Sequence, residues 1–195
     1  MFINPKSGEI TLKVVYYGPA RSGKTTNLEY IHQRIPQENR GKLVSMKTQE
    51  DRTLFFDYMQ MEVGTIRGFK PKFNLYTVPG QVQYESTRKL VLRGADAVVF
   101  VADSQKKRLE ANMTAYRNMT DHLHQHRISI SSIPIVFQLN KCDMPDALQT
   151  DFLKAFFSLD ESIPCFEASA ITGKGVIPTL RTTIKLVIAQ LQATH

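Results

Sequence analysis

The sequence contains two cysteines in 195 residues, Cys142 and Cys165. Two cysteines are too few for a disulfide framework, and their spacing matches no metal-ligand pattern, so both are expected to be reduced, small hydrophobic side chains. Long hydrophobic runs are also missing, because the longest, at 95–102, is far too short to span a bilayer. No Gly/Ser linker, repeat or low-complexity tract divides the chain. With 42% hydrophobic residues, we expect one domain over residues 1–195 around one sizeable core.

Targeting and lipidation signals are missing as well. The first residues, MFINPKSGEI, lack the apolar region and the cleavage site of a signal peptide. Phe2 stands where N-myristoylation requires glycine, and the final residues, QATH, contain no cysteine for prenylation. These features predict a cytoplasmic protein without a lipid anchor.

The chain is basic, with a net charge of +7 and a pI near 9.4. Such a charge is compatible with nucleic acid, an anionic membrane surface or an acidic protein as a partner. The basic residues are spread along the chain, however, and the tightest group, at 106–108, is short and lacks interleaved aromatic residues. We interpret that group as a solvated helix start, rank an acidic protein partner second, and expect no nucleic-acid binding.

Three of the five histidines cluster at His122, His124 and His126. On a helix His122 and His126 would share a face, while His124 would point to the other side. No cysteine or carboxylate pattern completes a ligand set around this pair. We therefore interpret the cluster as a solvated helix end rather than a metal site.

Apolar runs alternate with helical patterns, which indicates a mostly parallel sheet with crossover helices. The segments at 54–61 and 69–78 are expected to form an antiparallel hairpin. The expected fold is α/β, a six-stranded, mostly parallel sheet with one antiparallel strand and about five helices. Ligands in such folds bind at the carboxyl ends of the strands. The strands are predicted at 12–17, 54–61, 69–78, 97–103, 133–139 and 165–169, and the helices with defined limits at 24–33, 108–124, 146–157 and 176–192.

Residues 18–26, GPARSGKTT, match the phosphate-binding pattern G-x-x-x-x-G-K-[ST]. The loop follows a predicted strand and opens a predicted helix, and this context distinguishes a phosphate-binding loop from a chance match. Backbone N–H groups from Ala20 to Thr25 and the helix N-terminus would form an anion-binding nest. Lys24 would reach the β- and γ-phosphates, and the Thr25 hydroxyl would bind Mg²⁺. The motif predicts a nucleoside triphosphate without identifying its base.

The base is predicted by Asn140-Lys-Cys-Asp143, at the end of a predicted strand. The Asp143 carboxylate would accept hydrogen bonds from guanine N1–H and its 2-amino group, whereas adenine would leave it unpaired. Asn140 would bridge to the phosphate loop, and the stem of Lys141 would lie along the base. NKxD alone is a weak signal, but an EASA segment ending at Ala170 follows the next strand, where the Ala170 N–H would meet guanine O6. Together these motifs predict GTP or GDP.

These segments, in this order and spacing, resemble the Ras-like small GTPases over nearly the whole chain. The resemblance is closer to the bacterial MglA family, the polarity-setting GTPases of gliding and twitching bacteria. It implies a Ras-like P-loop GTPase fold, Mg²⁺ as cofactor and recruitment from the cytoplasm to a cell pole. The residues that carry the narrower resemblance are YYGPARSGKTTNLEYI, EDRTLFFDY, GFKPKFNLYTVPGQVQY, RKLVLRGADAVVFVADS and IPIVFQLNKCDMPDAL.

The chain departs from most Ras relatives just before the expected catalytic glutamine. Thr77-Val-Pro-Gly80 stands where those relatives have D-x-x-G. Threonine at this position is characteristic of MglA proteins, and it removes the carboxylate that usually holds a Mg²⁺-bound water. Either the Thr77 hydroxyl or Asp57 from the neighbouring strand would take its place, and the sequence leaves both alternatives open.

Hydrolysis requires a positioned water and a cation for the developing charge. By resemblance, Gln81 orients the water and Arg52 acts as an arginine finger supplied in cis. Thr53 would be the switch residue that reaches Mg²⁺ and the γ-phosphate. Without the resemblance, Arg52 would be interpreted as a solvated loop charge.

The predicted site thus has two catalytic residues, Arg52 and Gln81, and two metal ligands, Thr25 and Thr53. The residues predicted to bind the nucleotide are Gly18, Ala20, Arg21, Ser22, Gly23, Lys24, Thr25, Thr26, Gly80, Asn140, Lys141, Asp143, Ser169, Ala170 and Ile171.

Ala20 stands where family members usually have a second glycine in the phosphate loop. In Ras-like proteins this position lies against the γ-phosphate and the catalytic glutamine. A methyl group there crowds the transition state more than the ground state, so turnover should be slow while nucleotide binding is kept. The alternative is a local backbone adjustment that absorbs the methyl group.

Two functions are compatible with these residues. The first is a GTP-driven switch for polarity and motility that hydrolyses GTP slowly; the second is a non-cycling, GTP-bound scaffold whose hydrolysis Ala20 impairs. A P-loop small-molecule kinase is disfavoured, because NKxD and PGQ have no role in one. By resemblance, the partners are a roadblock-fold MglB-like activator dimer, polar response-regulator-like (RomR-like) proteins and the actin-like MreB.

Overall fold

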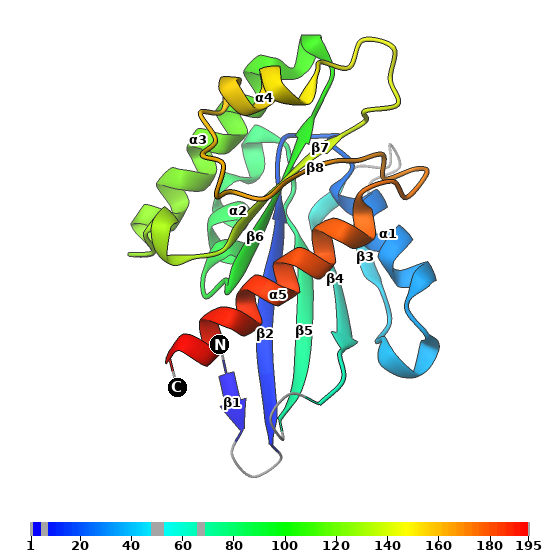
Figure 1. Cartoon of the computed structure of the whole chain (residues 1–195), viewed down its shortest axis with the longest axis vertical. Coiled ribbons are helices and arrows are strands. Elements are labelled where there is room, and N and C mark those ends of the chain that lie inside the picture. Colours follow the sequence, from blue (N-terminus) through cyan, green and yellow to red (C-terminus); the bar gives the residue numbers. More distant parts are fainter. Residues whose placement is uncertain (1, 5–7, 48–52, 66–68, 195) are drawn as a thin grey trace.

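A computed structural model describes residues 2–4, 8–47, 53–65 and 69–194. Over these residues the chain forms one eight-stranded sheet and five α-helices (Figure 1). The strands are β1 (Phe2–Asn4), β2 (Glu9–Tyr17), β3 (Val44–Lys47), β4 (Thr53–Glu62), β5 (Lys70–Thr77), β6 (Ala97–Asp103), β7 (Ile135–Asn140) and β8 (Cys165–Glu167). The helices are α1 (Lys24–Arg34), α2 (Glu85–Leu92), α3 (Leu109–Gln125), α4 (Thr150–Phe156) and α5 (Val176–Thr194).

The strands lie in the order β3-β4-β5-β2-β6-β7-β8, with β1 paired to β2. The pairs from β5 to β8 are parallel, and β4 pairs antiparallel with β5, so the predicted hairpin is confirmed. All six predicted strands are present, but the predicted strand number was too small. The additional strands, β1 and β3, are three and four residues long. Strands this short carry too little alternating pattern to be recognised without their pairing partners.

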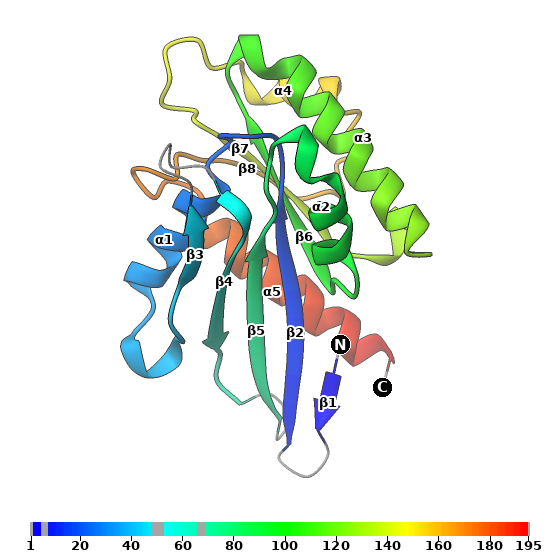
Figure 2. The ribbon, with the colours of Figure 1, turned by 180° about the vertical axis from the view of Figure 1, so that it is seen from behind.

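The helices cover both faces of the sheet. Helices α1 and α5 pack on one face, and α2, α3 and α4 pack on the other (Figures 1 and 2). β2 serves both layers because side chains alternate along a strand. Val14 and Tyr16 belong to the core beneath α1 and α5, whereas Val15 and Tyr17 belong to the core beneath α2 and α3. The parallel strands therefore direct their carboxyl ends to one edge, and the loops that follow β2, β5, β6, β7 and β8 meet there.

Two helix predictions need correction. α4 begins at Thr150 rather than at 146, and Asp146 instead lies in the preceding turn, where it accepts a hydrogen bond from Gln105. The interpretation of the histidines as a solvated helix end was wrong for His122, which is 2% exposed at the interface between α3 and α2. His124 is exposed. Among the described residues no group of three or more His, Cys, Asp or Glu side chains is arranged to hold a metal ion.

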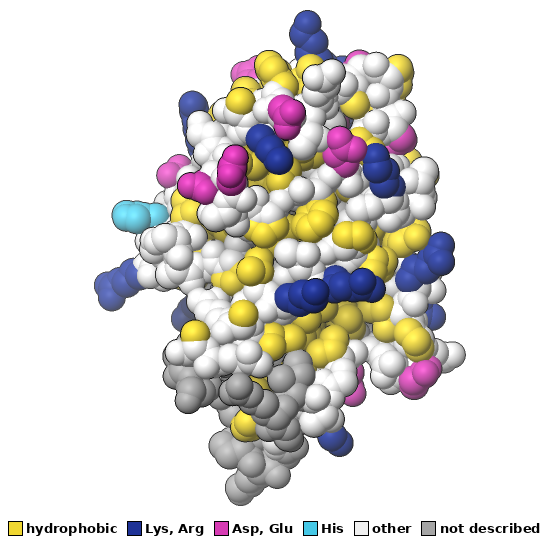
Figure 3. All heavy atoms as spheres, viewed as in Figure 1, with side chains coloured by type: hydrophobic (Ala, Val, Ile, Leu, Met, Phe, Trp, Pro, Cys, Tyr) yellow, Lys and Arg dark blue, Asp and Glu magenta, His cyan; other side chains and the backbone are white. Residues whose placement is uncertain are grey.

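The face that carries α5 shows dispersed basic side chains, and most of its acidic side chains lie toward the end of the molecule where α4 lies (Figure 3). None of the helices in the described part of the chain has the length and hydrophobicity that a membrane span requires. β1 and the carboxyl end of α5 lie close together, at the end of the sheet opposite the loops that follow the parallel strands (Figures 1 and 2).

Candidate functional site

The phosphate loop connects β2 to α1, and its two motif glycines are required by close contacts. Gly18 and Gly23 have φ angles of 149° and 97°. A Cβ on Gly18 would lie 2.2 Å from the carbonyl oxygen of Val101, and one on Gly23 would lie 2.2 Å from Asn140 Nδ2. Both positions therefore exclude side chains for conformational and steric reasons. Gly23 is also the N-cap of α1, so the helix N-terminus faces the loop.

The Lys24 side chain folds back over this loop. Its Nζ donates hydrogen bonds to the carbonyl oxygens of Gly18 and Pro19, at 2.9 and 2.7 Å. Burial lowers the pKa of Lys24 to about 7, and the Asp57 carboxylate opposes the shift. The ammonium is thus poorly solvated, and an anion bound in the loop would stabilise its charged form.

Asn140 joins the three motifs that were predicted to form the nucleotide site. Its Nδ2 donates to the carbonyl oxygen of Ser22 at 2.6 Å, and its Oδ1 accepts the N–H of Ala170 at 2.8 Å. The predicted bridge from Asn140 to the phosphate loop is therefore present. The Ala170 N–H, which was predicted to meet guanine O6, is directed at Asn140 here. Asp143 is exposed at the rim of the site.

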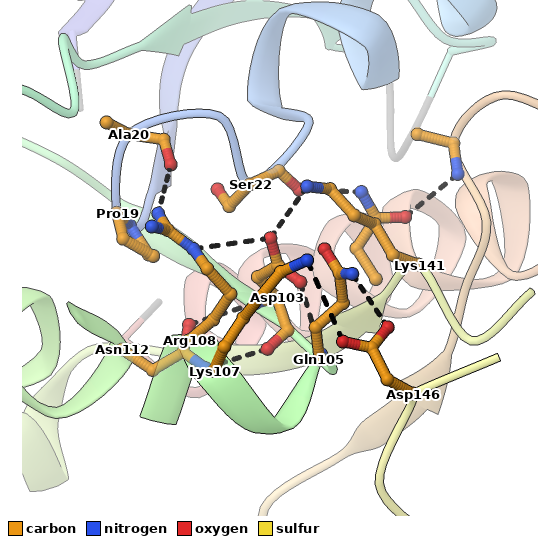
Figure 4. Close-up of polar contacts among 12 residues, drawn as sticks. Pro19, Ala20, Ser22, Asp103, Gln105, Lys107, Arg108, Asn112, Lys141 and Asp146 are labelled. Carbon is orange, nitrogen blue, oxygen red and sulfur yellow. Dashed lines mark hydrogen bonds and ion pairs between the residues drawn. The ribbon is translucent and has the colours of Figure 1, made fainter. Parts of the chain in front are cut away.

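A buried carboxylate that the sequence motifs did not indicate lies behind this region (Figure 4). Asp103 ends β6 and is fully buried. Its Oδ2 lies 2.6 Å from Lys141 Nζ and 3.6 Å from Arg108 Nε. Arg108 Nη2 in turn donates to the carbonyl oxygen of Ala20 at 2.6 Å. One carboxylate thus connects the NKxD lysine, whose stem was predicted to lie along the base, to the phosphate loop.

The main chain of Asp103 is fixed by α3. Asn112 accepts the Asp103 N–H at 2.9 Å and donates to its carbonyl oxygen at 2.8 Å. These hydrogen bonds stop β6 at a defined residue and orient its carboxylate toward the site. The available sequence signal was a charged residue at the end of a completely buried strand, which requires a compensating partner.

A second buried carboxylate, Asp57 of β4, lies on the phosphate side. The hydroxyls of Thr25 and Thr77 donate to its Oδ2 at 2.5 and 2.6 Å, and the Ser45 hydroxyl donates to Oδ1. The Asp57 N–H also donates to Thr77 Oγ1 at 2.8 Å. The structure therefore places the two residues that the sequence left as alternatives in contact with each other, and the role of either toward Mg²⁺ stays a prediction. Thr77 supports Asp57, and Asp57 brings a carboxylate to the hydroxyl of Thr25.

The segment after β5 packs directly on the phosphate loop. A Cβ on Gly80 would lie 2.3 Å from both Cα and N of Ala20, so this contact requires glycine. Gln81 follows, and it lines one hollow together with Gly80 and Ala20. The Gln81 side chain is half-buried, and its Oε1 accepts a hydrogen bond from Gln83 at 3.1 Å. The structure therefore brings together Ala20 and Gln81, the two residues of the crowding hypothesis.

Comparison with known proteins places the chain in a family. Residues 9–189 match the family described as "Elongation factor Tu GTP binding domain". The chain is 49% identical to "Mutual gliding-motility protein MglA" of Myxococcus xanthus (strain DK1622) over 191 residues, which is 98% of this chain and 97% of that protein. The chain belongs to the MglA family of Ras-like GTPases. It is also 29% identical to "Ras-related protein RabZ" of Dictyostelium discoideum over 113 residues, 57% of this chain and 47% of RabZ.

Membership in the MglA family establishes a small GTPase that binds guanine nucleotide. The roles predicted for individual residues remain predictions. Arg52 lies outside the described residues, and Thr53 begins β4 without a described side chain. Arg21 is exposed and has a left-handed backbone, and Ile171 is 81% exposed at the edge of the base loop. Ser22 and Ser169 are buried, while Thr25 and Thr26 are half-buried at the start of α1.

Proposed function

We propose that this MglA-family GTPase is a switch for cell motility and polarity that binds partners in its GTP state and releases them after slow hydrolysis. The extensive identity to a gliding-motility protein supports the cellular role. The packing of Gly80 on Ala20 supports the mechanism, because the segment that carries Gln81 rests on the loop that binds the phosphates. A change at the phosphates is therefore transmitted directly to that segment.

The residues around Asp57 fit a magnesium ion. A buried carboxylate whose described partners are hydroxyl groups favours a nearby cation, and oxygen ligands are those that Mg²⁺ prefers. Thr25 and Asp57, with the predicted Thr53, would hold the ion directly or through water. Bound there, Mg²⁺ would neutralise developing charge on the phosphates.

Hydrolysis in this proposal depends on Gln81 and Arg52. Gln81 orients the attacking water, and Arg52 supplies positive charge to the transition state in cis. Ala20 limits the rate because its main chain packs against Gly80 and the residue lines one hollow with Gln81, so its methyl group reduces the space available there. The ground state tolerates that methyl group better than the transition state does.

Replacing Ala20 tests this account. Ala20→Gly should raise the single-turnover rate of phosphate release by about tenfold, with little change in GTP affinity. The gain should vanish in an Ala20→Gly, Gln81→Ala double variant, because the methyl group acts through the water-positioning residue. Equal rates for the parent and Ala20→Gly would rule out crowding.

The alternative function is a GTP-bound scaffold that recruits partners without cycling. The departures at Ala20 and Thr77 favour it, since both affect the hydrolytic side of the site. Mass spectrometry of the nucleotide retained after purification separates the two functions. Mostly GDP supports the switch, and mostly GTP supports the scaffold.

The proposed partners follow from membership in the family. They are a roadblock-fold MglB-like activator, polar response-regulator-like proteins and MreB, with recruitment from the cytoplasm to a pole and no role for nucleic acid. Pull-downs with the GTP-loaded and GDP-loaded protein test this set. A switch should retain these partners in the GTP state and lose them in the GDP state.

A further inference from the structure

A buried arginine to which the sequence motifs assigned no role contacts the segment that carries Gln81. Arg88 lies on α2 and is 3% exposed. Its Nη1 donates a hydrogen bond to the main-chain carbonyl oxygen of Gln81. A guanidinium keeps its charge at every physiological pH and presents several donors in a fixed plane, so it can hold a carbonyl oxygen in place. Gln81 is thus held on one side by Gly80 against the phosphate loop and on the other by Arg88.

Arg88 lies next to a group of polar side chains that leads into the core. The hydroxyl of Tyr17, the last residue of β2, lies near the Arg88 guanidinium and 3.3 Å from Nδ1 of His122. His122 Nε2 lies 3.4 Å from Glu85 Oε1. Arg88 and Glu85 both belong to α2. The series of polar side chains therefore starts at this helix, passes through Tyr17 of β2 and His122 of α3, and ends at the same helix.

The protonation states allow the hydrogen bonds from Tyr17 to His122 and from His122 to Glu85. Burial raises the pKa of Tyr17 to about 12, so its hydroxyl is neutral. Burial lowers the pKa of His122, although Glu85 opposes the shift and Arg88 and Lys89 reinforce it. A neutral imidazole accepts the Tyr17 proton at Nδ1 and donates its Nε2–H to Glu85. The lone pairs of the neutral Tyr17 oxygen face no competing donor among the described residues, which suits its position near the Arg88 guanidinium.

We propose that Arg88 is a positioning residue for GTP hydrolysis, which holds the main chain of Gln81 and lies next to the paired side chains of Tyr17 and His122. This inference rests on the proposed function, in which Gln81 orients the attacking water. Its reason is geometric. Gln81 precedes a single 3₁₀ turn at Val82–Tyr84 and has a half-exposed side chain, so without the carbonyl anchor its amide would sample positions away from the phosphate loop.

A purely structural role for Arg88 makes different predictions. If Arg88 only attached α2 to α3, its loss would lower the melting temperature and affect hydrolysis regardless of Gln81. A positioning role lowers the rate of the chemical step, leaves nucleotide affinity nearly unchanged, and has no effect once the glutamine amide is gone. The interaction between the two substitutions therefore separates the explanations.

The experiment measures single-turnover phosphate release, GDP and GTP affinity, and melting temperature in the full chain with Mg²⁺. Arg88→Lys keeps the charge but loses the planar set of donors, and it should slow hydrolysis at least about tenfold while affinity stays within about threefold. Tyr17→Phe keeps the buried ring and removes the hydroxyl, so it should slow hydrolysis by a smaller factor. Lys89→Ala, which removes a positive charge from an exposed neighbouring position on α2, is the matched control and should hydrolyse at the parental rate.

Gln81→Ala and the Gln81→Ala, Arg88→Lys double variant complete the test. The proposal expects both to hydrolyse at the same reduced rate. If Gln81→Ala is slow but Arg88→Lys matches the parent, or if the two reductions multiply in the double variant, the positioning role is wrong while the proposed function stands. If Gln81→Ala hydrolyses at the parental rate, the proposed role of Gln81 fails and the inference about Arg88 fails with it.

Discussion

The two sides of the nucleotide site are each built around a fully buried aspartate, and the two carboxylates have different partners. On the base side, Asp103 pairs with the charged groups of Lys141 and Arg108. On the phosphate side, Asp57 accepts hydrogen bonds from three hydroxyl groups. The first carboxylate is paired directly with two cations of the protein, whereas the described hydrogen-bond donors to the second are neutral hydroxyl groups and the Lys24 ammonium acts on it electrostatically.

This difference predicts that the base side keeps a fixed geometry, whereas the phosphate side changes when a cation arrives with the nucleotide. A carboxylate paired with buried or half-buried cations keeps one geometry, because moving either partner exposes an uncompensated charge. A carboxylate held by hydroxyl groups gains from a cation that arrives with the ligand. We therefore expect substitutions on the base side to affect binding of both nucleotides, and substitutions on the phosphate side to distinguish GTP from GDP.

The largest expected effect concerns the rim of the base side. Asp143→Asn presents a donor where guanine's 2-amino group donates, whereas the 2-oxo group of xanthine accepts that donor. The ratio of GTP to XTP affinity should change by roughly 10⁴-fold, as expected when a site loses a matched polar partner. Titrations with both nucleotides measure it. Unchanged GTP affinity without any gain for XTP would show that Asp143 does not recognise the base.

Removing the charge on the phosphate side should have the next largest effect. Asp57→Asn should slow hydrolysis about 10²–10³-fold, the size typical of losing one electrostatic group from a site of phosphoryl or acyl transfer. The loss should be visible in Mg²⁺ and disappear when parent and variant are compared in EDTA. Mg²⁺ titrations of nucleotide affinity and phosphate release provide the measurement. If the rates of the parent and of Asp57→Asn differed by the same factor with and without Mg²⁺, the role of Asp57 would be purely structural.

The matched substitution on the base side is Asp103→Asn. It leaves Lys141 and Arg108 without their carboxylate, and a lost charged hydrogen bond corresponds to a roughly ten- to hundredfold change in affinity. GDP and GTP should weaken by the same factor, independently of Mg²⁺. Isothermal titration with each nucleotide measures this. A selective loss of GTP binding would contradict the division between the two sides.

The smallest expected effect is a pH dependence of binding through Lys24. Burial lowers the pKa of its ammonium to about 7 in the free protein, and bound phosphates raise it. Binding therefore takes up a proton above pH 7, and affinity should fall about fivefold between pH 7 and pH 8. Calorimetry in two buffers of different ionisation enthalpy detects that proton. Lys24→Arg stays charged throughout, so this variant should lose the dependence.

The sequence predicted the nucleotide-binding motifs of the site better than the residues that hold these motifs in place. The phosphate loop, NKxD and the segment at Ala170 each have a fixed spacing that follows from contacts with one ligand. Their placement at the carboxyl ends of β2, β7 and β8 agrees with the structure. Asn140 shows why the spacing was informative, because its side-chain amide bonds to both the phosphate loop at Ser22 and the segment at Ala170.

Arg108 could not be predicted as a supporting residue because its partner Ala20 is distant in sequence, and only the fold brings the two together. Arg88 lies seven residues after Gln81, but no sequence motif indicates that its guanidinium would donate to a main-chain carbonyl oxygen. His122 was assigned to a solvated helix end since spacing cannot tell which face of a helix is covered. It is buried by α2, a helix whose limits were not defined from the sequence.

The neighbouring positions of β1 and the end of α5 have a practical consequence for imaging. Phe2 of β1 pairs with Thr11, and the stretch of β2 from Thr11 to Tyr17 spans roughly 20 Å at about 3.3 Å per residue. A fluorescent domain attached at the amino-terminal end would therefore begin at about that distance from the phosphate loop. Two different fluorophores, one at each end, would lie close enough to each other for strong energy transfer. Such a doubly labelled protein would report its location and its unfolding in one measurement, while leaving the nucleotide loops uncovered.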